Sequence, residues 1–182
     1  MHRLSFAALA LVVACSSSSD KHVDAGPTPP MVDSSRYGAD LAGITGDRTH
    51  GNAHWMETQD RCAQRFEELG YTVERYAYAT GVDVVGVLPG TTTPDERVYI
   101  SAHYDTVTMC SGADDNGTGI AGVLEAARLL AMTPHKRTLV VGCWDEEERG
   151  LIGSKAYVTR AKSANEKIVG SFVFEMIGYK SE

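Results

Sequence analysis

The 182-residue sequence lacks the short motifs that mark several common classes of catalytic site. It contains no HExxH, no GxSxG, no GxxxxGK[ST] and no CxxC. It also lacks a basic surplus: its formal net charge is −7, which argues against a nucleic-acid partner. The remaining composition is that of an ordinary globular protein, with acidic residues concentrated at 114–115 and 145–148. Carboxylates so close together repel one another, so a compensating cation is expected.

The apolar segment at the N-terminus, residues 4–13, is too short to span a membrane as a lasting helix. With Arg3 before it, this segment is typical of an export signal. The stretch "LVVAC", followed by "SSSSD", resembles a bacterial lipoprotein signal, in which Cys15 becomes the lipid-modified first residue. An ordinary signal peptide cut nearby is the alternative. We therefore expect residues 1–14 to be a lipoprotein-type signal peptide and the protein to be exported. Lipidated Cys15 would then anchor it to a membrane, facing the periplasm or the exterior.

Residues 15–36 are rich in Ser, Pro and Asp and poor in apolar side chains, so they are predicted to be a disordered linker. The remaining residues, 37–182, are predicted to form one domain, because the length suits a single domain and no internal repeat is present.

Apolar periodicity predicts that this domain has an α/β fold. Helices are expected at 53–69, 117–132 and 151–163, and strands at 71–78, 82–90, 96–105, 137–144 and from 167 onward. The second half alternates strand and helix, which predicts parallel strands with right-handed crossovers. The expected architecture is a three-layer sandwich around a mixed, largely parallel sheet.

Three of the expected parallel strands run directly into acidic residues. The strand at 97–102 is followed by His103 and Asp105, the strand at 138–144 by the acidic run 145–148, and the strand at 168–174 by Glu175. The carboxyl ends of parallel strands meet at one edge of the sheet, where open α/β sheets place their ligand sites. The loop that contains Asp114 and Asp115 leaves the same edge.

Histidine nitrogen together with carboxylate oxygen suits zinc, and also manganese or cobalt. Carboxylates can bridge two such ions, as in aminopeptidases and phosphatases. Asp105 lies two residues after His103 and is placed to accept the other imidazole N–H, which would fix the tautomer. Within the acidic run, one residue can bind a metal while its neighbour faces water as a general base.

Other chemistries leave the acidic residues without a purpose. Cys110 with His103 as a nucleophile and base pair is the main rival. The sequence does not determine whether Cys62, Cys110 and Cys143 form a disulfide or are buried as small apolar residues. His50, His54 and His135 are expected to be surface or local polar residues.

Three stretches in order, "AHYDT", "GADDNGTGIAGVLEAARLL" and "EEERGLIGSKAY", resemble the M28 family of zinc aminopeptidases, of the bacterial leucyl aminopeptidase type. The resemblance covers residues 37–179 and implies the zinc-exopeptidase fold and two Zn²⁺ ions per complete domain. It implies that His103 and Glu148 bind one zinc, that Asp115 bridges both, and that Glu175 binds the second.

By the same resemblance, Glu147 is the general base and Asp105 orients the histidine, whereas Asp114 matches no ligand. The Asp115–Asn116 bond aligns with a non-proline cis peptide of the family. The implied reaction is hydrolysis of N-terminal residues from a peptide substrate.

The family's fifth ligand, a histidine some tens of residues beyond Glu175, has no counterpart among the 182 residues, nor do the later strands of the sheet. We therefore expect an incomplete domain that lacks its C-terminal part. Two alternatives remain: a transferase on the same fold that cyclises N-terminal glutamine, and an inactive, truncated lipoprotein.

Overall fold

The computed structural model describes residues 30–179. In chain order the elements are α1 (Ser34–Ile44), α2 (Ala53–Glu68), β1 (Thr72–Ala77), β2 (Val82–Leu88), β3 (Thr93–His103), the irregular helical turn η1 (Ala113–Thr118), α3 (Gly119–Ala131), β4 (Arg137–Trp144), α4 (Ile152–Ser163) and β5 (Lys167–Val173). Every helix and strand expected from periodicity is present. Helix α1 is an addition.

The strands form one mixed sheet in the order β1-β2-β4-β3-β5. Strand β3 is parallel to both β4 and β5, whereas β1–β2 and β2–β4 are antiparallel pairs. The three strands expected to be parallel are therefore parallel. Their two pairings, β3–β4 and β3–β5, are the parallel ones among the four pairings of the sheet. As a result, the carboxyl ends of β3, β4 and β5 lie at the same edge.

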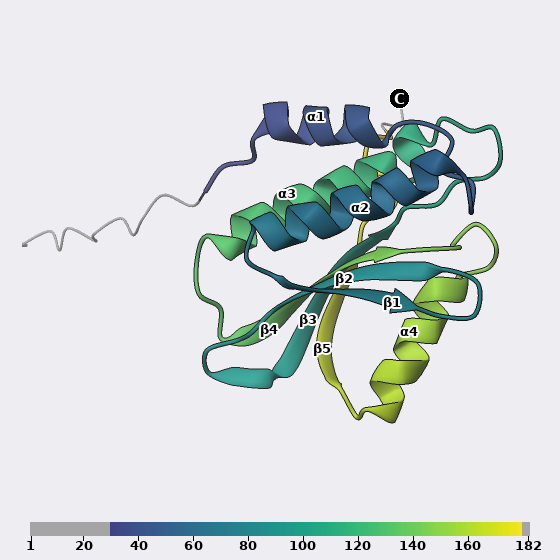
Figure 1. Ribbon diagram of the computed structural model, residues 1–182. Coiled ribbons are helices and arrows are strands. Elements are labelled where there is room, and N and C mark those ends of the chain that lie inside the picture. The colour runs from purple at the N-terminus through teal and green to yellow at the C-terminus, as the bar shows by residue number, and fades with distance from the viewer. Residues whose placement is uncertain (1–29, 180–182) are drawn as a thin grey trace, which may run out of the picture.

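Helices cover both faces of this sheet, which confirms the three-layer α/β sandwich. Figure 1 shows α1, α2 and α3 on one face and α4 on the other. Successive strand residues point to opposite faces, so each strand contributes to both layers. Ile100 and Val141 pack in the core beneath α2 and α3, while their neighbours Tyr99 and Val140 pack against Tyr157 of α4.

Helix α1 begins at Ser34, inside the range expected to be a disordered linker. The Asp33 side chain caps the helix by accepting hydrogen bonds from the backbone N–H groups of Ser35 (3.0 Å) and Arg36 (3.1 Å). The last residues of the expected linker therefore belong to the folded domain. The predicted signal peptide and Cys15 lie outside the described residues. Between residues 30 and 179, every helix is too short or too polar to cross a membrane.

The three cysteines of the described segment are free thiols. Of the two possibilities left open, the structure shows buried thiols: Cys62 of α2 and Cys143 of β4 are fully buried in the core between the helices and the sheet, and Cys110 is half-buried.

Candidate metal centre

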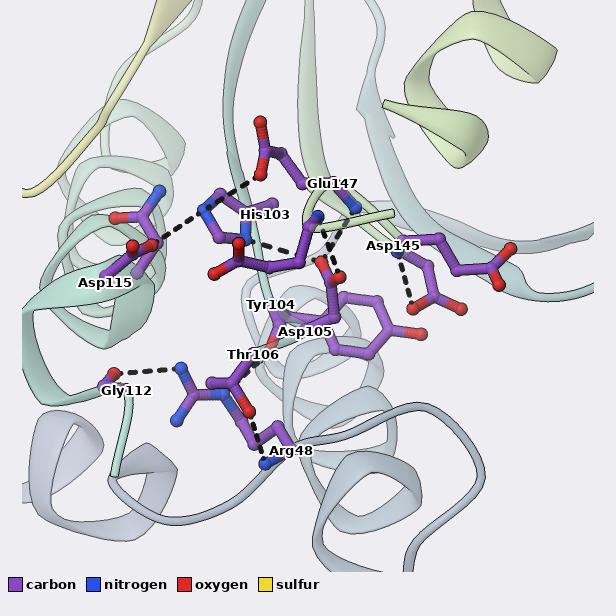
Figure 2. A network of polar contacts seen from close by, with 12 residues as sticks. Arg48, His103, Tyr104, Asp105, Thr106, Gly112, Asp115, Asp145 and Glu147 are labelled. Atoms are coloured by element: carbon purple, nitrogen blue, oxygen red, sulfur yellow. Dashed lines mark hydrogen bonds and ion pairs between the residues drawn. The ribbon is translucent and has the colours of Figure 1, made fainter. Parts of the chain in front are cut away.

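The predicted site residues meet at the carboxyl-terminal edge of β3, β4 and β5. His103 is the last residue of β3, and Asp115 lies within η1. Glu147 and Glu148 follow β4, and Glu175 follows β5. Figure 2 shows His103 between Asp115 and Glu147, with Asp105 below it.

The His103 side chain is buried, with 3% of its surface exposed, and carboxylates surround its ring. Nε2 lies 3.1 Å from Oδ1 of Asp115, 3.5 Å from Oε1 of Glu175 and 4.0 Å from Oε2 of Glu147. On the opposite side of the ring, Nδ1 lies 3.3 Å from Oδ1 of Asp105. One ring nitrogen therefore faces the carboxylate cluster and the other faces Asp105, the arrangement typical of a metal-binding histidine.

His103, Asp115 and Glu148 each offer one ligand atom, and these atoms lie within 4.8 Å of one another. One nitrogen and two carboxylate oxygens at this separation suit a single Zn²⁺ ion. Glu175 stands beside them and is held by Asn116, whose Nδ2 donates to Oε2 of Glu175 over 3.1 Å. The structure therefore brings together all four residues that the sequence analysis proposed as ligands.

Asp105 has a second role that sequence reasoning missed. Besides facing His103, its two carboxylate oxygens accept hydrogen bonds from the backbone N–H groups of Glu147 (3.0 Å) and Glu148 (3.1 Å). Asp105 is buried, so these bonds are shielded from water. One carboxylate thus connects the end of β3 to the loop after β4 that carries both glutamates.

The electrostatics of the cluster favour a bound cation. Burial raises the pKa of Glu148, and the charge of Asp115 raises it further while His103 opposes the rise. Burial also raises the pKa of Glu175. Burial lowers the pKa of His103, but the contact with Asp105 and the charges of Glu175 and Glu147 raise it to about 9. Without a cation, the carboxylates therefore retain protons more readily and rely on a protonated histidine for compensation.

Two residues of η1 support the cluster from the side. The Asp115–Asn116 peptide bond is cis, as the resemblance implied. Oδ1 of Asn116 accepts hydrogen bonds from the N–H groups of Gly119 (3.1 Å) and Met176 (3.2 Å), and so connects η1 to the segment after β5. The Asp114 carboxylate accepts instead from Thr118 (3.0 Å) and Gly178 (3.0 Å), which is consistent with its exclusion from the ligands.

Arg48 is a supporting residue that the sequence analysis missed. Its side chain is fully buried, and it donates to the backbone carbonyls of Tyr104 (2.6 Å), Ile44 (2.7 Å) and Gly112 (2.9 Å). It thereby joins the N-terminal helices to both ends of the loop between β3 and η1 (Figure 2). Nothing in the local sequence distinguishes this arginine from a surface one.

His50 is a half-buried polar residue, with 29% of its side chain exposed, and it lies beside buried acidic residues. Its Nδ1 lies 3.7 Å from Oε1 of Glu146 and 3.9 Å from Oδ2 of Asp145, both fully buried. His50 lines a hollow of about 430 Å³ beside the cluster, together with Asp105 and Glu148. His54 and His135 make local polar contacts, as expected. Nε2 of His54 contacts the backbone carbonyl of Ile44, and Nε2 of His135 contacts that of Leu130.

Comparison with known proteins shows the family of this chain. Residues 83–182 match peptidase family M28, which is more than half of the chain. The chain belongs to peptidase family M28. It is 34% identical over 171 residues to leupeptin-inactivating enzyme 1 of Streptomyces exfoliatus, covering 86% of this chain and 39% of that enzyme.

Several solved structures have the same fold as this M28 chain. The crystal structure of LapB from Legionella pneumophila matches with a TM-score of 0.70 at 25% identity, over 80% of this chain and 44% of that one. A Zn-dependent exopeptidase from Parabacteroides distasonis matches with a TM-score of 0.71 at 19% identity, over 84% and 64%. A glutaminyl cyclase from Bacteroides thetaiotaomicron matches with a TM-score of 0.68 at 17% identity, over 82% and 64%. In length, the chain spans about two fifths of the S. exfoliatus enzyme.

Proposed function

We propose that this M28 domain is a zinc-dependent exopeptidase that removes N-terminal residues from peptides. The observation that carries the proposal is the convergence of His103, Asp115 and Glu148, with ligand atoms within 4.8 Å of one another, at the edge where β3, β4 and β5 end. The donor set of one imidazole and several carboxylates fits zinc.

The proposed roles are those that the family resemblance implies for these side chains. His103 and Glu148 would bind one zinc, Asp115 would bridge to a second, and Glu175 would bind that second ion. When bound, the zinc ions lower the pKa of the attacking water and polarise the scissile carbonyl.

Glu147 is proposed to move the proton. Its side chain is 35% exposed, and Oε2 lies on the cluster side, 4.0 Å from Nε2 of His103. Its backbone N–H is held by Asp105, so the carboxylate projects from a fixed point. Glu147 would take a proton from the attacking water and later deliver it to the leaving amine. The free α-amine of the peptide would be held on the Glu175 side of the site.

The proposal extends to the cellular location. If residues 1–14 are removed as a lipoprotein signal, the domain is exported and anchored through lipidated Cys15, where it would act on peptide substrates outside the cytoplasm.

The experiment compares Glu147→Gln with the unchanged chain in zinc binding and in release of the N-terminal residue from leucine-led peptides. The variant is expected to bind zinc normally and to lose about 100-fold or more in kcat, because a general base contributes 10²–10⁴-fold. Glu57→Gln, an exposed carboxylate on α2, is the matched control and should keep its activity.

Activity of Glu147→Gln at the unchanged level would reject the assignment. The glutaminyl cyclase alternative is supported only by the shared fold, and an assay with a glutamine-led peptide separates it. A cyclase would release ammonia from a glutamine-led peptide, whereas an aminopeptidase would release free glutamine.

A further inference from the structure

The loop between β4 and α4 carries Glu147 and Glu148, and its backbone is held in an unusual way. Each N–H group of residues 145–148 donates to a buried carboxylate. Asp105 accepts from the last two, as described above. Glu146 adopts a left-handed backbone conformation, with φ of 52°, which is strained for a residue other than glycine. Such a conformation persists only where the surroundings fix it.

The first two of these N–H groups depend on carboxylates that the proposed chemistry does not use. The N–H of Asp145 donates to Oδ1 of Asp83 over 2.9 Å, and the N–H of Glu146 donates to Oδ1 of Asp145 over 2.8 Å. Asp83 lies on β2 and Asp145 directly after β4, and both are fully inaccessible to solvent. Burying two carboxyl groups costs free energy, so we expect this pair to fulfil a structural role.

Asp145 also connects the loop to two other parts of the fold. Its Oδ1 accepts from Nε1 of Trp55 on α2 over 2.8 Å, and its Oδ2 accepts from the backbone N–H of Val82 over 3.1 Å. Its backbone carbonyl accepts from the N–H of Gly153 at the start of α4, over 3.1 Å. Helix α2, strand β2 and helix α4 therefore all meet at this one residue.

Two glycines make room for these carboxylates. A Cβ at Gly81 would lie 2.4 Å from Oδ2 of Asp145, and a Cβ at Gly153 would lie 2.2 Å from Oδ1 of Asp83. Any larger residue would displace an oxygen that accepts a backbone hydrogen bond. The fit around Asp83 and Asp145 is therefore specific to this arrangement.

We propose that Asp83 and Asp145 are positioning residues that set the backbone of loop 145–148 and thereby aim Glu147 and Glu148 at the metal centre. Asp83 fixes the loop where it leaves β4, Asp145 fixes the left-handed turn at Glu146, and Asp105 fixes the far end. Neither Asp83 nor Asp145 is one of the proposed metal ligands or the proposed general base. This positioning role rests on the proposed zinc function only because zinc affinity is one of the two measurements that test it.

The two aspartates differ in a way that makes the proposal testable. Both oxygens of Asp145 accept backbone or indole N–H groups, so an amide at this position would leave one buried donor facing another. Oδ2 of Asp83, in contrast, is buried and accepts nothing, whereas Oδ1 accepts one N–H. An amide at position 83 can therefore keep the hydrogen bond to Asp145 without displacing any donor.

The experiment compares Asp83→Asn with Asp145→Asn in two measurements on the full chain. The first is the hydrogen-exchange rate of the Glu147 and Glu148 amides relative to those of Val140 and Val141 in β4. The second is zinc affinity, measured by competition with a chromophoric chelator. Asp145→Asn should speed exchange at Glu147 and Glu148 selectively and weaken zinc binding about tenfold or more, as loss of a ligand-supporting partner usually does. In Asp83→Asn, the relative exchange rate and the zinc affinity should both stay within about twofold of their values in the unchanged chain.

Glu125→Gln is the control for a general loss of stability. Glu125 is also a buried carboxylate that accepts a backbone N–H, that of Asp33 over 2.6 Å, but it lies on α3, away from loop 145–148. This variant should leave the exchange ratio and the zinc affinity unchanged. A folded Asp145→Asn protein with unchanged exchange ratio and zinc affinity would overturn the proposal.

A second comparison covers the case in which Asp145→Asn does not fold. Asp83→Leu keeps the same branched arrangement of heavy atoms, with bulkier methyl groups in place of the oxygens, and removes the acceptor for the Asp145 N–H, so it should speed loop exchange and weaken zinc binding where Asp83→Asn does not. Equal behaviour of these two variants would overturn the proposal. The exchange measurement needs no zinc, so failure of the positioning role is distinct from failure of the proposed peptidase function, which would appear as normal loop exchange without zinc-dependent hydrolysis.

Discussion

Asp83 is a fully buried carboxyl group with one oxygen that has no hydrogen-bond partner. Burial raises the pKa of its carboxyl to about 7; the hydrogen bond from the Asp145 N–H opposes this rise, and the charges of Asp145, Asp105 and Glu146 add to it. A buried charge with one unpartnered oxygen destabilises the folded state unless a proton neutralises it. The ionisation of Asp83 should therefore make the stability of this domain dependent on pH.

The direction of this pH dependence follows from the pKa of Asp83 in the folded and in the unfolded chain. An aspartate in an unfolded chain titrates near pH 3.9, so between about pH 4 and pH 7 the folded state binds more protons at Asp83 than the unfolded state. The contribution of Asp83 to stability is thus present in full below about pH 4 and is lost as the pH rises to about 7. Asp83→Asn has no proton to lose, so its stability relative to the unchanged chain should increase across this window, by at most about 4 kcal/mol.

Urea unfolding of both proteins at pH 4.5 and at pH 8 measures this difference. Asp95→Asn, which alters an exposed aspartate, is the control and should show no such trend. A gap between Asp83→Asn and the unchanged chain that is equal at both pH values would show that Asp83 is already charged at the lower one.

The cluster residues could be predicted from the sequence, but the residues that hold them could not. His103, Glu148 and Glu175 follow apolar strands whose direction the alternation of elements implies, and Asp115 lies in a motif in the loop that leaves the same edge. Asp83 sits inside an apolar strand, and no local pattern shows that its Oδ1 accepts a hydrogen bond from residue 145, 62 positions later. Such supporting contacts depend on register across the sheet, which periodicity does not specify.

At the scale of elements, helix α1 is the one that the sequence analysis placed in part within a linker. Its intrinsic helix propensity is weakened by Gly38 and Gly43. Its stability comes from tertiary contacts: Asp40 pairs with Arg65 of α2 over 3.0 Å, and Ile44 is fully buried in the core. A short helix of this kind depends on partners distant in sequence, which explains why local composition predicted its start incorrectly.

The cap of α1 can be tested directly. Asp33→Ala removes the acceptor for the N–H groups of Ser35 and Arg36, so the free energy of unfolding should fall by about 1 kcal/mol. Asp33→Asn retains a side-chain oxygen at the same position and should lose much less. Urea unfolding measures both variants, and equal losses would mean that the charge, rather than the cap, provides the stabilisation.

At the scale of the whole molecule, the sheet of the described residues has two edge strands, β1 and β5, and of these β5 exposes large apolar side chains. The direction of β3, β4 and β5 and the placing of helices on both faces follow from the alternation of strands and helices, and both were predicted correctly. Within residues 30–179, strand β5 pairs only with β3. Its apolar side chains are exposed, including Phe172 at 59% and Val173 at 62%. An unpaired strand edge next to exposed apolar side chains favours pairing with another chain.

This edge predicts concentration-dependent self-association of the 182-residue chain. Phe172→Lys places a charge on β5 and should reduce the association, because an edge lysine disfavours edge-to-edge pairing. Met56→Lys is the matched control: Met56 is similarly exposed, at 51%, but lies on helix α2, which packs against β1 and β2 rather than β5, and this variant should associate like the unchanged chain. Sedimentation velocity over a series of concentrations measures all three proteins, with circular dichroism to confirm that each is folded. If both lysine variants reduce association equally, general surface charge rather than the β5 edge controls it.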